Sequence, residues 1–255
     1  KMNPLTLKEA EKLFFSVAVG VSRIKKTDIV ICPPFLYLPS FAKALAGKGK
    51  VKKQIFLGAQ NSFFGDTGAF TGEISGEMLY EIGARYVILG HSERRYPPVG
   101  GGETNEVINK KIKDSLIAGL RPIVCVGESV RDEDHSYFNF VKTQLEECLV
   151  GISKSSISKI IIAYEPVWAI SSVLNHKDAA PNECREMIIF IRKILSDKFG
   201  KDTKQMKIIY GGSVNEKNAE GFLKDGGSDG LLVGQVSLDS KKFTEIIKIA
   251  ENLEK

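Results

Sequence analysis

The chain is poor in the residues that bind metals, form disulfides or cross membranes. Its 255 residues include four cysteines, three histidines and one tryptophan. The cysteines are scattered, with no Cys-x-x-Cys pair and no metal-ligand spacing, at Cys32, Cys125, Cys148 and Cys184. We therefore expect reduced thiols, a cytoplasmic location and no metal site. No apolar run is long enough to span a membrane and no signal peptide is visible, so we expect no membrane partner.

The charge pattern gives no sign of a nucleic-acid partner either. The net charge of +5 comes with short lysine runs, and aromatic residues do not interleave with them. We therefore expect a solvated surface and no nucleic-acid binding. Apolar residues make up 43% of the chain and charged residues 26%, as in ordinary globular proteins. No linker interrupts the chain, so residues 1–255 are expected to form a single domain.

Short apolar runs alternate with helical stretches along the whole chain. The strand candidates are Ile29–Cys32, Ile55–Ala59, Tyr86–Leu89, Ile123–Val126, Lys159–Ala163, Lys207–Tyr210 and Gly230–Val233. Parallel strands joined by right-handed helical crossovers produce this alternation, which predicts an α/β fold. Thr6 and Glu9 have the spacing of a helix capping box. Pro181 suits the first turn of a helix that runs to about Phe199.

A histidine and a glutamate each follow one of these strands directly. His91 lies in the segment Gly90–Arg95, and Glu165 lies in the segment Ala163–Trp168. The carboxyl ends of parallel strands meet at one edge of the sheet, which is where barrel enzymes place their chemistry. A lone histidine is more often a satisfied core residue, and a lone Glu-Pro pair is more often a surface turn. The two full segments are what favours a site.

Together with Tyr210–Val214 and Leu232–Gly234, these segments resemble the triosephosphate isomerase family, and the resemblance runs from Lys1 to the last helix. It implies a (β/α)8 TIM barrel that interconverts dihydroxyacetone phosphate and D-glyceraldehyde 3-phosphate in glycolysis and gluconeogenesis, without a cofactor. The chain opens with residues that follow the first strand in that family. We therefore expect the first strand and the true N-terminus to be missing from the recorded chain.

Moving a proton between adjacent carbons requires a base and a donor to the developing oxyanion. The resemblance assigns the base to Glu165, and we expect Tyr164 and Trp168 to give it apolar walls. It assigns the oxyanion donor to His91, as a neutral imidazole at a helix N-terminus, an arrangement of which triosephosphate isomerase is itself the type case.

Two further charged residues complete the expected catalytic set. Lys1 matches the family's active-site lysine, which would attract the phosphate and stabilise enediolate charge. Glu93 is either a proton shuttle or an ion-pair partner of Lys1. Arg94 is expected to pair with a carboxylate such as Glu73 or Glu103, in a structural role.

Backbone N–H groups are expected to hold the substrate phosphate. Gly212 and Ser213 follow one late strand, and Gly234 and Gln235 follow the next. Glycine lets the main chain approach an anion closely, and barrels commonly bind phosphate after their last two strands. Gln235 stands where the family often has glycine, but its N–H would still donate.

The lid and one loop depart from the family's pattern. The lid tip Ser171–Ala180 is longer than usual and lacks glycine. Ser171 is still expected to offer its N–H to the phosphate, and Tyr210 and Ser213 are expected to latch the closed lid. The insert Tyr96–Gly102 is rich in proline and glycine and predicts a surface loop near His91.

A protruding loop indicates self-association. The segment Gln60–Glu73 resembles the family's dimer loop and carries Phe63, Phe64 and Phe70. Aromatic side chains on a connecting loop are costly in water, so we favour a homodimer in which a second subunit buries them. Folding back onto their own barrel is the alternative.

Two other functions stay open at this point. The altered lid is compatible with a related barrel enzyme that acts on another small sugar phosphate. A non-catalytic binder of phosphate ligands is the second alternative, although binding alone would need neither Glu165 nor His91.

Overall fold

The computed structural model describes residues 1–47, 54–97, 99–170 and 177–254. Strands and helices alternate along it, as the sequence pattern predicts. The strands are β1 (Ile29–Ile31), β2 (Ile55–Ala59), β3 (Tyr86–Leu89), β4 (Arg121–Val126), β5 (Ile161–Tyr164) and β6 (Lys207–Tyr210). All the pairs in this sheet are parallel and follow the order β1-β2-β3-β4-β5-β6. The α/β class and the barrel architecture are therefore confirmed.

The seventh predicted strand needs a correction. Within Gly230–Val233, only Leu231 bridges the sheet, through a parallel contact with Tyr210. Ser228 Oγ hydrogen-bonds the carbonyl oxygen of Gly230, so a side chain takes part in the bonding just before this segment. Regular ladder pairing is therefore short here. The prediction of a strand before Lys1 concerns residues outside this chain and stays a prediction.

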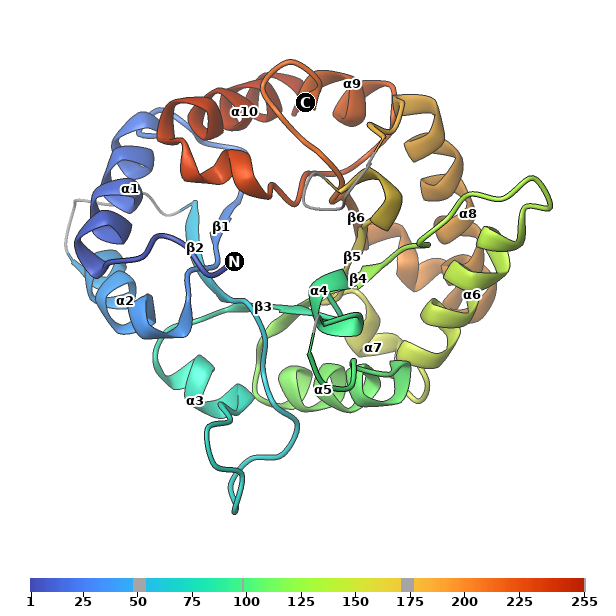
Figure 1. Cartoon of the computed structure of the whole chain (residues 1–255), viewed down its shortest axis with the longest axis horizontal. Helices are drawn as coiled ribbons and strands as arrows, with labels where there is room; N and C mark the ends of the chain where they lie inside the picture. Colours follow the sequence, from blue (N-terminus) through green and yellow to red (C-terminus); the bar gives the residue numbers. More distant parts are fainter. Residues whose placement is uncertain (48–53, 98, 171–176, 255) are drawn as a thin grey trace.

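The helices surround the strands in a ring (Figure 1). They are α1 (Leu7–Gly20), α2 (Leu38–Ala46), α3 (Gly76–Glu81), α4 (Ser92–Arg95), α5 (Asn105–Ile117), α6 (Ser136–Cys148), α7 (Lys154–Ile157), α8 (Pro181–Phe199), α9 (Ala219–Lys224) and α10 (Ser240–Leu253). Short 3-10 turns are η1 (Phe35–Tyr37), η2 (Val167–Ala169), η3 (Gly200–Gln205) and η4 (Gln235–Leu238). No helix in these described stretches is long and apolar enough to cross a membrane.

Local signals fix the helix ends where the sequence places them. Thr6 and Glu9 form the expected reciprocal capping box at the start of α1. Pro181 opens α8, which ends at Phe199. Because proline has no N–H to satisfy and a helical φ, it is well suited to that first position.

The sheet packs apolar side chains on both of its faces. The face toward the helices belongs to a large core that includes Leu57, Leu89 and Ile162. The opposite face forms a small separate cluster of Tyr86, Ile123, Cys125 and Ala163. Because side chains alternate along a strand, successive residues feed the two clusters in turn.

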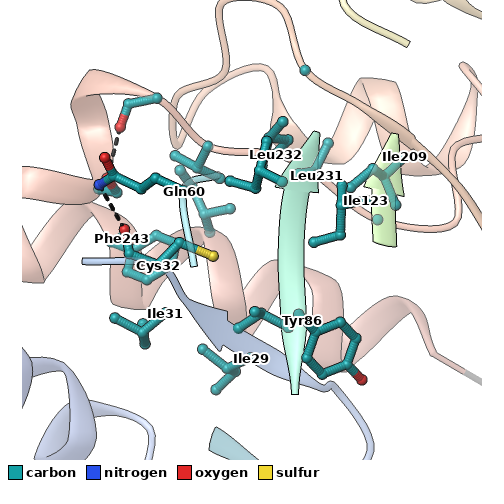
Figure 2. A pocket seen from close by; sticks show the side chains of 18 of the residues that line it. Ile29, Ile31, Cys32, Gln60, Tyr86, Ile123, Ile209, Leu231, Leu232 and Phe243 are labelled. Carbon is teal, nitrogen blue, oxygen red and sulfur yellow. Dashed lines mark hydrogen bonds between the residues drawn. The ribbon is translucent and has the colours of Figure 1, made fainter. Parts of the chain in front are cut away.

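A cavity of about 1230 Å³ lies inside the curve of the sheet (Figure 2). Its walls include Ile29, Ile123 and Leu232, and it reaches the inner sides of α1 and α10. At its mouth, Gln60 Nε2 donates to the carbonyl oxygens of Cys32 at 2.9 Å and of Lys1 at 3.0 Å. These bonds tie the start of the chain to the ends of β1 and β2.

Candidate active site

His91 and Glu165 meet at the mouth of this cavity, where His91 lies two residues past the end of β3 and Glu165 one residue past the end of β5. His91 Nε2 lies 2.9 Å from Glu165 Oε1. The other carboxylate oxygen accepts the backbone N–H of Ser92 at 3.1 Å. Only 4% of the Glu165 side chain is exposed, so the carboxylate is buried with both oxygens in contact with donors. A buried carboxylate without such partners would be strongly destabilising.

The hydrogen bonds of His91 define its tautomer. His91 is the N-cap of α4, and its Nδ1 accepts the backbone N–H of Glu93 at 3.2 Å. An accepting Nδ1 carries no proton, so in the neutral ring the proton is on Nε2. Nε2–H therefore points at Glu165 and is the donor available to an oxygen in the cavity.

Lys1 and Glu93 form an ion pair beside this histidine. Glu93 Oε2 lies 4.0 Å from His91 Nδ1, so the pair borders the imidazole. The structure thus brings Lys1, Glu93, His91 and Glu165 to one mouth of the barrel, while their roles stay predictions.

One glycine makes room for the backbone of Glu165, which the neighbouring strands also hold by hydrogen bonds. Glu165 N–H donates to the carbonyl oxygen of Val126, and Gly211 N–H donates to that of Tyr164, both at 2.8 Å. A Cβ on Gly127 would lie 2.1 Å from the carbonyl oxygen of Glu165. No side chain fits there, because the main chain after β4 passes directly against that of Glu165.

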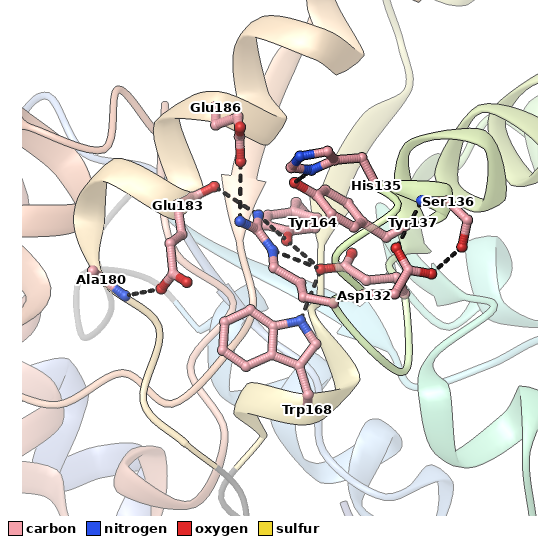
Figure 3. Close-up of polar contacts among 11 residues, drawn as sticks. Asp132, His135, Ser136, Tyr137, Tyr164, Trp168, Ala180, Glu183 and Glu186 are labelled. Carbon is pink, nitrogen blue, oxygen red and sulfur yellow. Dashed lines mark hydrogen bonds and ion pairs between the residues drawn. The ribbon is translucent and has the colours of Figure 1, made fainter.

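The expectation that Tyr164 and Trp168 give Glu165 apolar walls stays a prediction. Their polar atoms, Tyr164 Oη and Trp168 Nε1, donate to another carboxylate, Glu128 Oε1, at 2.9 and 2.8 Å (Figure 3). A buried phenol or indole requires a hydrogen-bond partner, and Glu128 supplies one to both. Burial, followed by the charge of Glu128, raises the pKa of Tyr164 well above its ordinary value.

Arg131 joins this cluster to α8. Its guanidinium contacts Glu128 at 3.4 Å, Glu186 at 3.0 Å and the carbonyl oxygen of Glu183 at 3.1 Å (Figure 3). It also lies over the Trp168 ring, 5.6 Å from the ring centre. Arg131 thereby contacts Trp168, which precedes positions 171–176, as well as Glu183 and Glu186, which follow them.

The expected phosphate cradle is only partly free to bind. Gly212, Gly234 and Gln235 line the same cavity as Glu165. Ser213 directs both its N–H and its hydroxyl to the carbonyl oxygen of Ala169, at 3.0 and 2.8 Å. Ser213 would have to leave Ala169 before either group could reach an anion, whereas Gly212 has a more direct approach.

The two departures from the family differ in how far they can be described. Ser171 and most of the lid tip lie outside the described residues. The insert Tyr96–Gly102 ends where Glu103 N–H donates to the carbonyl oxygen of Arg94 at 2.9 Å. Arg94 also pairs with Glu103 through side chains at 2.8 Å, which confirms that expected ion pair.

The loop Gln60–Glu73 extends outward from the ring between β2 and α3 (Figure 1). The rings of Phe63 and Phe64 stack at 4.5 Å, and that of Phe70 lies 4.8 Å from Phe63. Phe70 is still 48% exposed. The aromatic rings therefore pack on one another and leave an apolar surface at the loop.

Sequence reasoning overlooked Glu128. It follows β4 directly, as Gly127-Glu128, and so carries the same positional signal that identified His91 and Glu165. A search for polar residues just past every buried strand would have found Glu128. Arg131 carries no comparable signal, because apart from Glu128 its partners come from α8 and the loop after β5.

Comparison with known proteins gives a consistent result. The family model described as triosephosphate isomerase matches residues 1–250. A triosephosphate isomerase of Caldanaerobacter subterraneus subsp. tengcongensis is 43% identical over 95% of this chain and 94% of its own length. Those of Aquifex aeolicus and Dehalococcoides mccartyi are 42% and 43% identical, over 97% and 100% of this chain and 95% and 96% of their own lengths.

Proposed function

The chain belongs to the triosephosphate isomerase family and is an isomerase, and from that premise we propose that it interconverts dihydroxyacetone phosphate and D-glyceraldehyde 3-phosphate through an enediolate. The single observation that carries the proposal is the 2.9 Å contact between His91 Nε2 and Glu165 Oε1 at the barrel mouth. A base and a proton donor that touch each other can also touch adjacent atoms of one small substrate.

In the proposed reaction, Glu165 removes a proton from the carbon beside the substrate carbonyl. The C–H electron pair becomes the C=C bond of an enediolate, and negative charge develops on the carbonyl oxygen. Glu165 then returns the proton to the neighbouring carbon, while the hydroxyl proton on that carbon's oxygen is transferred to the former carbonyl oxygen, so that hydroxyl and carbonyl exchange places. To begin, the carboxylate must exchange its contacts with His91 and Ser92 for the substrate C–H.

His91 and Lys1 are proposed to stabilise the charge. The Nε2–H of His91, freed from Glu165, donates to the developing oxyanion, and the Lys1 ammonium adds positive charge nearby. A preoriented donor of this kind contributes about 10²–10³-fold in rate. Glu93 orders both groups, since it pairs with Lys1 and its N–H holds the imidazole.

The phosphate is proposed to bind to backbone N–H groups of Gly212, Gly234 and Gln235. All three line the cavity that contains Glu165. Ser213 joins them once it leaves Ala169, and Ser171 is proposed to add its N–H from the lid. Backbone donors suit a dianion because they cannot be displaced by a competing side-chain rotamer.

The test is glyceraldehyde 3-phosphate isomerisation by the wild-type protein, Glu165→Gln and Glu106→Gln. Glu106 is an exposed glutamate of α5 and serves as the matched control. We expect turnover to fall by at least about 10²–10⁴-fold in Glu165→Gln, the range for loss of a general base, and to persist in Glu106→Gln. Wild-type protein that turns over another sugar phosphate faster, or not at all, would reject the substrate assignment.

We further propose that the protein is a homodimer located in the cytoplasm. The reaction would be a step of glycolysis and gluconeogenesis. The exposed Phe70 on the protruding loop supports self-association, and the four free cysteines fit a reducing compartment. Sedimentation of Phe70→Ser tests the dimer: it should be shifted toward monomer. Ile117→Ser, which removes an exposed apolar side chain from α5, should sediment as the wild type.

A further inference from the structure

Arg95, the last residue of α4, is held by acceptors from four different segments. Its Nε donates to the carbonyl oxygen of Gly90 at 2.8 Å and its Nη1 to Asn105 Oδ1 at 2.6 Å. Its Nη2 donates to the carbonyl oxygen of Cys125 at 3.0 Å and lies 3.7 Å from Cys148 Sγ. One side chain therefore connects β3, β4, α5 and α6.

This guanidinium replaces ladder pairing where β3 and β4 part. Their register runs from Tyr86 opposite Arg121 to Leu89 opposite Val124. At the next residue, Gly90, φ is +68° and the chain turns away from the sheet. The carbonyl oxygens beyond the last pair would lack a common partner, and Arg95 binds one from each strand.

Both of these backbone contacts border the proposed catalytic pair. Gly90 directly precedes His91, and Val126, the residue after Cys125, accepts the backbone N–H of Glu165 at 2.8 Å. Burial, followed by the charge of Glu165, raises the pKa of the Cys125 thiol well above its ordinary value. The position of the Arg95 guanidinium thus bears on both His91 and Glu165.

The partners of Arg95 are unusual for a cation. All four are uncharged, and no carboxylate in the described stretches forms an ion pair with it; Glu147 reaches it only through Asn105. Partly buried charges are ordinarily paired with opposite charges. What these contacts do use is the planar fork of donors, which a lysine ammonium does not have.

We propose that Arg95 is a positioning residue that sets the separation of His91 and Glu165 by clamping the carbonyl oxygens of Gly90 and Cys125. The inference rests on the proposed function for its kinetic consequences only. A displacement of about 1 Å in a catalytic group can cost about 10²-fold in rate. Loss of the clamp should therefore reduce kcat and leave phosphate binding unchanged, because the expected cradle belongs to other strands.

The experiment compares Arg95→Lys and Arg95→Met with Arg121→Met. Arg121 opens the same strand β4 at its other end, where it donates to Tyr86 Oη at 3.1 Å. We expect both Arg95 variants to lose about 10–100-fold in kcat, with unchanged KM and unchanged affinity for inorganic phosphate. Arg121→Met should keep its kcat. Urea unfolding of each variant gives its folded fraction under the assay conditions, and kcat is compared per folded molecule.

A second readout does not depend on turnover. The chain has three histidines, so the Nε2–H resonance of His91 can be assigned by NMR in protein with ¹⁵N-labelled histidine. We expect this resonance to shift in folded Arg95→Met and to stay in place in Arg121→Met. If the wild type does not isomerise triose phosphates, the proposed function fails, and this resonance still decides the role of Arg95.

Chemical rescue adds a test of the clamp itself. Arg95 lines a cavity of about 560 Å³ together with Ser136 and Asn139 of α6, so guanidinium ions have room to occupy its place in Arg95→Ala. Low, non-denaturing guanidinium should restore part of kcat, and equal sodium chloride should not. The proposal would be overturned if both Arg95→Lys and Arg95→Met kept the wild-type kcat. It would also be overturned if the losses in kcat matched the loss of folded protein and the His91 resonance did not shift.

Discussion

His91 Nε2 and Glu165 Oε1 are hydrogen-bonding partners at 2.9 Å, so the proposed oxyanion donor and the proposed base engage each other. Each is held from its other side by backbone: Nδ1 by the N–H of Glu93 and Oε2 by the N–H of Ser92. The start of α4 therefore orients both side chains through two successive N–H groups. A substrate oxygen has only to replace the carboxylate on Nε2.

We expect His91→Gln to lower kcat by about 10²–10³-fold, the usual cost of one oxyanion donor. A glutamine lacks the rigid ring that Glu93 N–H orients, so its amide would not be held where charge develops. KM should change little, because the proposed phosphate contacts, Gly212, Gly234 and Gln235, follow other strands. Steady-state kinetics in both directions measure this. A large rise in KM at unchanged kcat would show that His91 only binds substrate.

Gly127→Ala should damage both stability and activity. The new Cβ would lie 2.1 Å from the carbonyl oxygen of Glu165, and the main chain there cannot move without shifting Glu165, the proposed base. Overpacking of this kind costs about 1–3 kcal/mol in the free energy of unfolding. Urea titration and turnover test it against Gly101→Ala, whose Cβ meets nothing within 4 Å. Equal stability of the two variants would contradict the close approach.

The single tryptophan makes the Glu128 cluster directly observable. In Glu128→Gln, Trp168 Nε1 and Tyr164 Oη lose a charged acceptor that now lies at 2.8 and 2.9 Å. We expect a red-shifted emission and a loss of about 1.5–3 kcal/mol in the free energy of unfolding, as for hydrogen bonds to charged groups. Glu186→Gln touches Arg131 but not the indole, so its emission should match the wild type.

Glu251 predicts a specific dependence of stability on pH. Slight burial alone would raise the pKa of its carboxyl, but backbone N–H groups of Thr27, Lys25 and Lys26 outweigh it and lower the pKa from 4.5 to about 2. A depressed pKa contributes stability above the unfolded value, which is lost as pH falls through the folded one.

The stability difference between wild type and Glu251→Gln should therefore be full above about pH 5, shrink between pH 4.5 and 2, and vanish below that window. Urea midpoints measured across this range give the difference directly. A difference that stays constant down to pH 2 would show that the carboxylate acts by shape alone.

The sequence pattern predicts the alternating fold and the place of His91 and Glu165, because both follow from strand period and from where parallel strands end. The start of α1 and the bounds of α8 are equally local, since Thr6 and Pro181 carry their own signals. The weak pairing of Gly230–Val233 was not predictable in this way, because pairing depends on what lies beside the segment.

Contacts between distant segments also escaped prediction. Glu128 accepts hydrogen bonds from Tyr164 and Trp168, and nothing in their own segment indicates a carboxylate on the neighbouring strand end. Arg95 is a further case: its acceptors are backbone oxygens, which every residue has, so no residue type marks them in the sequence.

The insert Tyr96–Gly102 has a consequence for how this chain can change in evolution. Its far end is fastened to α4, because Glu103 N–H binds the carbonyl oxygen of Arg94 and Gly102 leaves no room for a Cβ against that of Arg95. Doubling the length of a flexible loop costs only about 0.6 kcal/mol. Apart from Gly102, this loop is therefore a point at which residues can be gained or exchanged as lineages diverge, while the edge of the barrel that carries His91 and Glu165 stays unaltered.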